Sequence, residues 1–404
     1  MRFVCVVSSL SASNQSRSGS DRRSASRLPE GRQRRRIGRG WALLLAASVV
    51  ALSGVSGCLL GSDDASSGTR LQWQSLGSGF DREVFALAVV DTVLYAGGSM
   101  TQGLQEMYVA RWNGGEWEGV SGDINGSVRA MVNYDGDLIV AGSFSRIGGI
   151  AARRIARWDG STWTAMATDV DGSIDHLIVH DGRLIAAGHF QSISGVSANQ
   201  IAAWNGSTWT PLGDGLGGRI TAVASYESSL IATGWITLLD SDEIRPLVSW
   251  DGVRWSPWPS LPPPNPIGLS VFSGVTSHQG QLYLAEERAS DDRTSELGVV
   301  HRWDRTHWTA LPGSVTHGTF SLEIDVFCSH NGILYLGGAV SALDGQPAYG
   351  IVQWNTRWSP LAEGLDGNVF ATTSWKGNLV VAGHFDHHGA PPLKNVALWG
   401  LPPD

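Results

Sequence analysis

The sequence is poor in cysteine and in long apolar runs. Its 404 residues include three cysteines, Cys5, Cys58 and Cys328, too few for a framework of several disulfides or for a zinc site built on cysteine. One apolar run, Trp41–Leu52, is too short for a comfortable membrane span. The chain also has no phosphate-binding glycine loop, no serine nucleophile elbow and no recognisable pair of catalytic carboxylates, which excludes the enzymes that depend on them.

Positive charge is scarce outside the first 57 residues. That segment contains ten arginines against Asp21 and Glu30, a net charge of +8. The whole chain carries −8, so residues 58–404 carry −16. A strongly negative domain repels a phosphate backbone, which argues against a nucleic-acid partner.

Residues 1–57 have the composition of an export signal. A basic run from Arg34 to Arg39 precedes the apolar run, and the small residues Val55-Ser56-Gly57 lead to Cys58. This order of charged, apolar and small residues predicts a secretory signal. Val55–Cys58 resembles the bacterial lipobox, which implies a lipidated Cys58 at the mature N-terminus and a short tether over residues 58–70. The resemblance implies an exported protein at the outer membrane or cell surface, with the lipid anchor as its only membrane contact. Ordinary secretion with an incidental cysteine is the alternative.

A Trp–turn–Trp frame organises the rest of the chain. It runs from Trp158 through Asp-Gly-Ser-Thr to Trp163. It recurs at Trp112–Trp117, Trp204–Trp209, Trp250–Trp255 and Trp303–Trp308, and one residue shorter at Trp354–Trp358. Asp-Gly favours a tight turn because glycine tolerates positive φ. We expect the two Trp of a frame to oppose one another across a hairpin and to pack in the core. Stacking of these rings on a ligand is the alternative.

Two further patterns precede each frame. The apolar segment Leu138–Phe144 has counterparts beginning at Leu94, Leu184, Leu230, Leu334 and Leu379, and a partial one at Leu282. Before it, Val128–Tyr134 has counterparts beginning at Val84, Ile174, Ile220 and Val369, with divergent ones near Phe272 and Ile324. Each unit therefore predicts four short strands, called a, b, c and d in chain order.

The spacing of the units predicts the fold. The first Trp of successive frames, ending with the unpaired Trp399, are 46, 46, 46, 53, 51 and 45 residues apart. Four strands repeated at such intervals are the signature of a β-propeller. The sequence therefore predicts an all-β fold, a seven-bladed β-propeller of four-stranded antiparallel blades, over residues 71–404. The strand around the unpaired Trp73 is expected to complete the last blade and remove its free edge.

The glycines of the b strands and the Trp pairs resemble kelch-type propellers. Leu94–Gly98 and Leu334–Gly338 carry a double glycine, although Trp stands where kelch repeats typically have tyrosine. The longer phrase Ile201–Gly218 is similar to bacterial secreted repeat proteins and to fungal cortical polarity-marker propellers. The resemblance covers residues 71–400 and implies a binding platform or, in a few cases, an enzyme. Copper chemistry of the galactose-oxidase type would need a Tyr–Cys crosslink, and Cys328 lies in no such context.

Acidic residues gather in the predicted d–a loops, which share one face of a propeller with the b–c loops. The candidate binding residues are Asp81, Asp123, Asp169, Asp171, Asp214 and Asp366. Repeated oxygen ligands suit Ca²⁺ or a cationic group, so Ca²⁺ is the one cofactor candidate of a chain otherwise predicted to use none. The alternative is that these residues are there for turn geometry.

Histidines form one dense cluster, and its members are the candidate metal ligands: His384, Asp386, His387 and His388. Imidazole and carboxylate are zinc ligands, but no partner at a defined spacing accompanies them. The histidines at the ends of a strands, His180, His278 and His330, align with aromatic residues of other units. We expect those three to serve packing.

Two functions fit these observations. The first is an exported bacterial lipoprotein whose propeller is a monomeric binding or scaffold module for a protein or glycan at the cell envelope. The second is an exported glycan-active enzyme with its site on the d–a/b–c face. An enzyme is expected to show irregular polar residues converging from several blades, whereas the small residues that recur in a strands, such as Ala86 and Ala130, favour binding or structure.

Overall fold

A computed structural model describes residues 71–401 except 121, 242, 265–269, 290–295, 318–325 and 388–391. The predicted export signal (1–57), Cys58 and the tether (58–70) therefore lie outside the described residues. All the regular elements of the described part are β-strands. Within it, no helical segment has the length and apolar character that crossing a membrane requires.

The first four blades are four-stranded sheets that follow one another along the chain. The first contains β2 (Val84–Val90), β3 (Val93–Gln102), β4 (Gln105–Trp112) and β5 (Trp117–Gly119). The second contains β6 (Val128–Tyr134), β7 (Asp137–Gly142), β10 (Ile155–Trp158) and β11 (Trp163–Ala165), with the hairpin β8 (Arg146–Ile147) and β9 (Ile150–Ala151) between β7 and β10. The third contains β12 (Ser173–His180), β13 (Arg183–His189), β16 (Ile201–Trp204) and β17 (Trp209–Pro211), with the hairpin β14 (Ser192–Ile193) and β15 (Val196–Ser197). The fourth contains β18 (Gly217–Tyr226), β19 (Ser229–Thr237), β20 (Ile244–Trp250) and β21 (Trp255–Pro257).

The remaining strands form a large sheet and two more four-stranded blades. The large sheet contains β22 (Ser270–His278), β23 (Gln281–Ala289), β24 (Glu296–Trp303) and β25 (Trp308–Ala310), extended by β26 (Val315–His317), β29 (Val340–Leu343) and β30 (Gln346–Pro347). The four-stranded blade that follows the large sheet contains β27 (Val326–His330), β28 (Ile333–Gly337), β31 (Ile351–Trp354) and β32 (Trp358–Pro360). The closing blade contains β33 (Gly367–Trp375), β34 (Asn378–His387), β35 (Leu393–Gly400) and β1 (Gln72–Ser75).

This topology corrects the predicted set of seven four-stranded blades. Six sheets have four strands, and the unit predicted fifth is part of a seven-stranded sheet. The cause is the long strand β24, whose first residues pair with β26 while its last residues pair with β25. Strand β26 pairs in turn with β29, which belongs to the next unit's b–c hairpin. The longer Trp intervals of this region are the only trace of that extension in the sequence.

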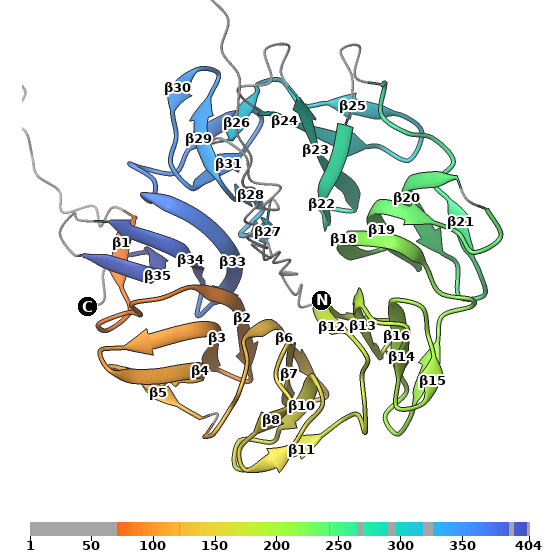
Figure 1. The fold of residues 1–404 in the computed structure, drawn as a ribbon. Coiled ribbons are helices and arrows are strands. Elements are labelled where there is room, and N and C mark those ends of the chain that lie inside the picture. The colour runs from red at the N-terminus through yellow and green to blue at the C-terminus, as the bar shows by residue number, and fades with distance from the viewer. Residues whose placement is uncertain are drawn as a thin grey trace, which may run out of the picture. The chain divides into compact units, whose positions relative to one another are not determined.

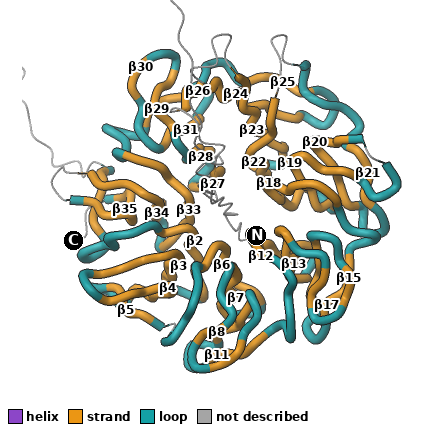
Figure 2. Tube along the Cα trace, in the orientation of Figure 1, coloured by secondary structure: helices purple, strands orange, loops and turns teal. Residues whose placement is uncertain are grey.

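The sheets succeed one another around a ring (Figure 1). Their innermost strands lie beside one another in the order β2, β6, β12, β18, β22, β27 and β33, and β33 returns to β2. Figure 2 shows the same ring as strands joined by loops, with no helix. This arrangement confirms the predicted β-propeller of antiparallel sheets.

The ring is closed by the first and last strands of the described chain. Strand β1 pairs antiparallel with β35, and Trp73 lies directly opposite Trp399, with ring centroids 5.1 Å apart. The expected completion of the last blade by the segment around Trp73 is therefore confirmed. The pairing satisfies the outer backbone edge of β35, which would otherwise be open to solvent.

The repeated Trp fix both the hairpins and the packing between blades. Trp158 and Trp163 are register partners with centroids 5.0 Å apart, as predicted for a core pair. Trp163 also donates from Nε1 to the carbonyl oxygen of Val120 in the preceding d–a loop, at 2.8 Å. Equivalent bonds run from Trp117, Trp209, Trp255 and Trp308. Because each indole buries its ring and satisfies its donor on the preceding unit, the Trp repeat holds successive blades together.

The opposite ends of the a strands are joined by histidine. The Nδ1 atoms of His180, His278 and His330 lie 2.7–2.9 Å from serine hydroxyls of the next unit. Burial lowers the pKa of all three imidazoles, so they are neutral near pH 7. Their expected packing role is confirmed.

A β-bulge interrupts the a strand opposite a glycine of the b strand. In the second blade the register shifts between Val128 and Ala130, opposite Gly142. A Cβ atom on Gly142 would lie 2.1 Å from the carbonyl oxygen of Ser127, so only glycine fits that approach. Gly98, Gly188, Gly234 and Gly383 occupy the equivalent place in four other blades. The large sheet has Glu286 there instead.

Candidate functional site

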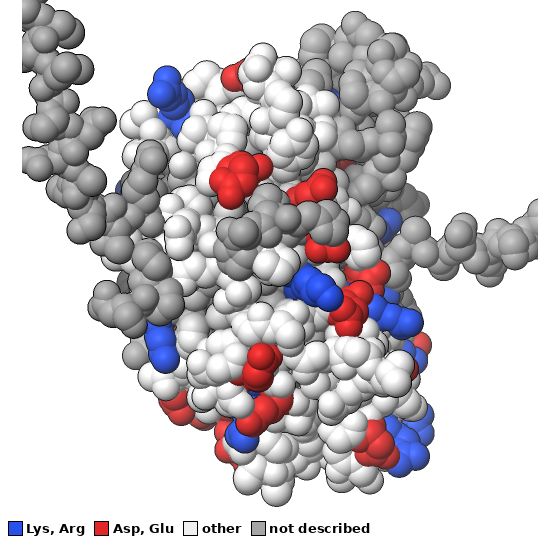
Figure 3. Space-filling model, turned by 90° about the vertical axis from the view of Figure 1, so that its left-hand side faces the viewer, with Lys and Arg blue, Asp and Glu red and all other residues white. Residues whose placement is uncertain are grey.

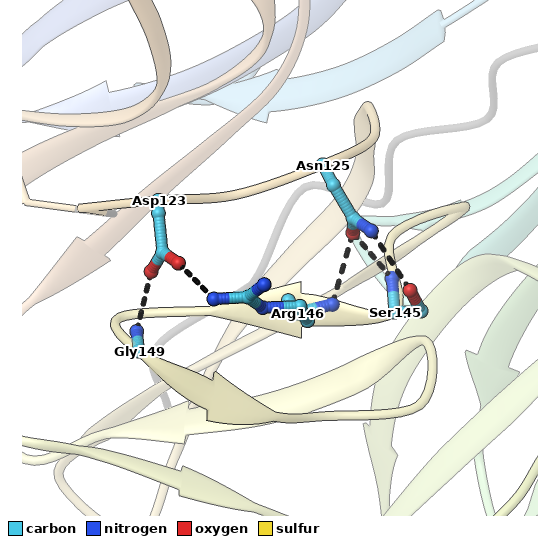
Figure 4. Close-up of polar contacts among 5 residues, drawn as sticks. All are labelled: Asp123, Asn125, Ser145, Arg146 and Gly149. Atoms are coloured by element: carbon cyan, nitrogen blue, oxygen red, sulfur yellow. Dashed lines mark hydrogen bonds and ion pairs between the residues drawn. The ribbon is translucent and has the colours of Figure 1, made fainter.

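The d–a loops and b–c hairpins meet on one side of the ring, which we call the loop face; the a–b and c–d turns form the turn face. In the second blade the loop 120–127 holds the hairpin β8–β9 (Figure 4). Asp123 accepts from the amide of Gly149 and from Arg146, both at 2.5 Å. Asn125 accepts from the amides of Ser145 and Arg146 at 2.8 and 2.9 Å. The loop therefore acts as a latch on the hairpin.

The third blade repeats this latch with Asp171. Its carboxylate accepts from the amides of Gln191 and Ser192, at 2.8 and 3.1 Å, and from the Ser192 hydroxyl at 3.0 Å. Burial acts to raise the pKa of Asp171, but these hydrogen bonds outweigh it and the pKa is lowered. Asp171 is thus ionised and committed to the hairpin β14–β15.

Asp81 plays the same part where the ring closes. It accepts from the amide of Gly103 at 2.8 Å and from Lys394 Nζ at 3.0 Å. The bond from Gly103, followed by the contact with Lys394, lowers the pKa of Asp81.

On the side drawn in Figure 3, acidic and basic side chains lie interspersed among uncharged surface, and no purely acidic patch forms there.

The other three candidate aspartates are held less tightly. Asp169 accepts from the Thr168 hydroxyl at 3.1 Å, and its carbonyl oxygen accepts from the amide of Ser194. The main-chain oxygen of Asp214 accepts a hydrogen bond from the side-chain amide of Asn199 at 2.7 Å. Asp214 also lines a pocket together with Leu239 and Asp240. Asp366 lines a second pocket, where the ring closes. The candidate aspartates therefore share a face, but they are spread over five loops, with Asp169 and Asp171 on the same one.

The pocket at the ring closure brings several predicted residues together. Its volume is about 430 Å³, and its lining includes Asp81, Asp366, His384, Asp386 and Lys394. His384 Nδ1 lies 3.4 Å from Glu83 Oε1 of the first blade. His384 and Asp386 alternate on β34 and so share one face. The side chain of His387 and the whole of His388 lie outside the described residues.

The described residues contain no group of three or more His, Cys, Asp or Glu side chains placed to hold a metal ion. The latches explain why the aspartates form no such group. The carboxylate oxygens of Asp81, Asp123 and Asp171 already accept hydrogen bonds from backbone amides or contact the side chains of Lys394 and Arg146. Calcium and zinc binding by the candidate residues therefore stay predictions.

The bulge residues of the inner strands form a ring, and sequence reasoning missed it. The bulged residues of the described inner strands are Phe85, Arg129, Asp175, Thr221, Ser273 and Phe370. Neighbours within this ring touch. The rings of Phe85 and Phe370 have centroids 5.7 Å apart, and Arg129 Nη1 lies 3.6 Å from Asp175 Oδ1. The signal was the residue after the first apolar residue of each a strand, which varies among Phe, Arg, Asp, Thr and Ser from unit to unit.

Asp175 is the charged centre of that ring. It is 3% exposed, and its Oδ2 lies 2.9 Å from His189 Nδ1 and accepts from the Ser173 hydroxyl at 3.1 Å. Burial acts to raise the pKa of Asp175, but His189, His176 and Arg129 outweigh it and lower the pKa. Burial lowers the pKa of Arg219. The negative charge of Asp175 acts to raise it but does not outweigh burial. Charged groups from the second, third and fourth blades thus converge at this point.

A second buried charge cluster lies in the large sheet, where Glu286 replaces the bulge glycine. Glu286 Oε2 lies 2.6 Å from His301 Nε2 and 2.7 Å from Arg288 Nη2. Burial opposes ionisation, but His301 and Arg288 lower the pKa of Glu286 to about 2. This carboxylate is a fixed anion with both partners supplied by its own sheet.

A match to a protein family supports the fold. Residues 135–158 and 180–202 match the family described as "Domain of unknown function (DUF5122) beta-propeller". No curated protein matches the chain at a significant level. Among solved structures, the computationally designed Ika8 protein is 13% identical, with a TM-score of 0.39, over 80% of this chain and 98% of that one. PorZ, a surface component of the type-IX secretion system of Porphyromonas gingivalis, is 13% identical with a TM-score of 0.19, over 76% of this chain and 44% of that one. The chain is a β-propeller repeat protein, similar to the DUF5122 family in two segments of its second and third blades.

Proposed function

We propose that the chain is an exported bacterial lipoprotein whose β-propeller is a binding or scaffold module at the cell envelope. A β-propeller by itself suggests such a module. The arginine-rich leader, the apolar run and the lipobox-like Val55–Cys58 support export and lipidation. The proposal places a monomer at the outer membrane or cell surface, held by the lipid on Cys58 and free of nucleic acid.

The loop face is the proposed binding surface, and the position of exposed apolar side chains carries this choice. Five of them lie in b–c hairpins or d–a loops: Leu104, Leu239, Ile244, Leu261 and Tyr349. On the turn face, three large apolar side chains of the described residues are exposed in this way: Val253, and Leu71 and Leu401 where β1 and β35 meet. Exposed apolar groups on a surface already held by latches can bind a protein or glycan with little further ordering cost.

Binding is favoured over glycan hydrolysis by the state of the carboxyl groups. Polar residues do converge from several blades at Asp175, as the enzyme alternative expects. Glycoside hydrolysis, however, needs one carboxyl group whose pKa is raised so that it can donate a proton. The pKa values of Asp171, Asp175 and Glu286 are all shifted downward.

The choice of face can be tested with a matched pair of labelled variants of the full chain. Leu104 on the loop face is 105% exposed and Val253 on the turn face is 79% exposed. Each is replaced by cysteine and coupled to a bulky polyethylene-glycol maleimide. We expect labelled Leu104→Cys to lose capture of solubilised envelope components, measured by pull-down and mass spectrometry, while labelled Val253→Cys keeps it. Loss confined to Val253→Cys would put the binding surface on the turn face.

Anchoring is tested at Cys58. The change Cys58→Ser removes the thiol that would carry the lipid, so the protein is expected to leave the detergent phase on partitioning or to remain unprocessed. Mass spectrometry of the mature N-terminus should show an acylated cysteine in the wild type. An unmodified N-terminus at another residue would remove the lipoprotein assignment and leave the binding module untouched.

A further inference from the structure

Two guanidinium groups flank one carboxylate on three successive inner strands. Arg129 lies on β6, Asp175 on β12 and Arg219 on β18. Arg129 contacts Asp175 at 3.6 Å, and Asp175 also acts electrostatically on Arg219. These strands are neighbours in the inner ring, and all three residues lie near the strand ends that follow the d–a loops.

Arg129 and Arg219 are two guanidinium groups that act on the one carboxylate of Asp175. Guanidinium groups remain protonated in proteins, and the lowered pKa of Asp175 keeps that carboxylate ionised. Arg219 Nε is buried and has no hydrogen-bond partner among the described residues. A buried charged donor without a partner is costly. An anion seated on Arg219 would supply the missing acceptor.

The neighbouring side chains indicate what kind of anion fits. Ser127, two residues before Arg129, lies with its hydroxyl 2.5 Å from the Ser99 hydroxyl of the first blade. Phe85 and Phe370 belong to the same ring of bulge residues as Arg129 and Asp175. Their half-buried rings contact one another. Hydroxyl groups beside aromatic rings suit the mixed polar and apolar faces of a sugar, and a planar guanidinium suits a carboxylate.

We propose that the inner ends of β6, β12 and β18 bind the carboxylate of an acidic saccharide, with Arg219 as its principal partner and Asp175 as the group that positions the arginines. This inference rests on the proposed binding function and names a ligand class for the loop face. The sequence predicted that the loop aspartates would bind a cation or a cationic group. Because most of those aspartates are engaged in latches, we propose an anionic ligand instead.

The test measures binding of hexuronic-acid and sialic-acid oligosaccharides to the full chain by calorimetry. Their methyl-esterified counterparts keep the sugar and remove the charge. We expect at least one acidic oligosaccharide to bind and its ester to bind at least tenfold more weakly. Binding of none of the acidic probes, or equal binding of an ester, would overturn the proposal.

Variants locate the site. Arg219→Gln is expected to weaken the acidic oligosaccharide at least tenfold. Arg254→Gln, an equal loss of charge from an exposed residue of the turn face, should leave its affinity unchanged. Equal weakening by both would mean non-specific attraction and overturn the proposal. If Arg219→Gln does not fold, Arg219→Lys keeps the charge without the planar fork and should still weaken binding.

The two proposals fail in distinguishable ways. Capture of envelope components that is blocked by labelled Leu104→Cys, together with no affinity for the acidic oligosaccharides, contradicts the saccharide site alone. Absence of both capture and oligosaccharide binding contradicts the binding module itself.

Discussion

Deleting residues 71–79 is expected to abolish cooperative folding of the propeller. The segment contains β1, and with it the buried Trp73 and Leu76, which are 4% and 5% exposed. Losing a buried Trp side chain alone costs about 3–5 kcal/mol. Its removal also leaves β35 without its outer partner. The sum approaches the roughly 5–15 kcal/mol by which a whole domain is stable. Circular dichroism during heating should show no sharp transition.

A single substitution separates the ring closure from a general effect of truncation. Trp73→Ala should lower the thermal midpoint by about 10 °C, given a few degrees per kcal/mol for a large domain. Leu71→Ala is the control, because Leu71 precedes the same strand and is 54% exposed. A Trp73→Ala midpoint indistinguishable from that of Leu71→Ala would mean that β1 does not hold the ring closed.

Adding one methyl group at Gly142 is expected to be nearly as damaging as removing a core side chain. The new Cβ would meet the carbonyl oxygen of Ser127 at 2.1 Å and the amide nitrogen of Arg129 at 3.1 Å. Both are backbone atoms, one in Ser127 just before the paired strand β6 and one within that strand, so the clash can be relieved only by separating the strands at the bulge. Overpacking of this kind costs about 1–3 kcal/mol or more. Chemical denaturation of Gly142→Ala should show this loss.

Gly119→Ala provides the matched control. Gly119 also lies in a strand, but its new Cβ would meet Met107 at 3.7 Å, an ordinary contact. Its free energy of unfolding should stay within about 0.5 kcal/mol of the wild type. If Gly142→Ala proved equally mild, the close approach of the two strands would not be what requires glycine. Gly142→Ala should also disturb Arg129, which is the bulged residue.

The fold could be predicted from the sequence because its main determinants are local and repeated. The Trp–turn–Trp hairpins, the glycines of the b strands and the unpaired Trp73 and Trp399 each leave a direct mark at a fixed spacing. The extension of the large sheet could not be predicted, since the pairing of β26 with β29 joins segments that carry no shared motif. Its three added strands depend on how the two hairpins meet in space.

The candidate site was predicted only in part, because residue type does not reveal what a side chain is already bonded to. The aspartates were placed correctly on loops of one face, yet Asp123 and Asp171 turn out to hold hairpins by backbone amides. Conversely, Arg129, Asp175 and Arg219 lie in strands that otherwise bury apolar side chains, about 45 residues apart. Only the β-bulge and the ring of inner strands bring them together.

The pairing of β1 with β35 also sets an order of events during synthesis. Gln74 at the start of the propeller donates to the carbonyl oxygen of Leu401, 327 residues later. At about 5–20 residues per second, a ribosome needs roughly 15–65 s to cover that distance. Throughout that interval the first strand has no partner, and the sheet that will receive it does not yet exist. Closing the ring therefore joins residues 327 positions apart, which places that step of folding after the synthesis of β35.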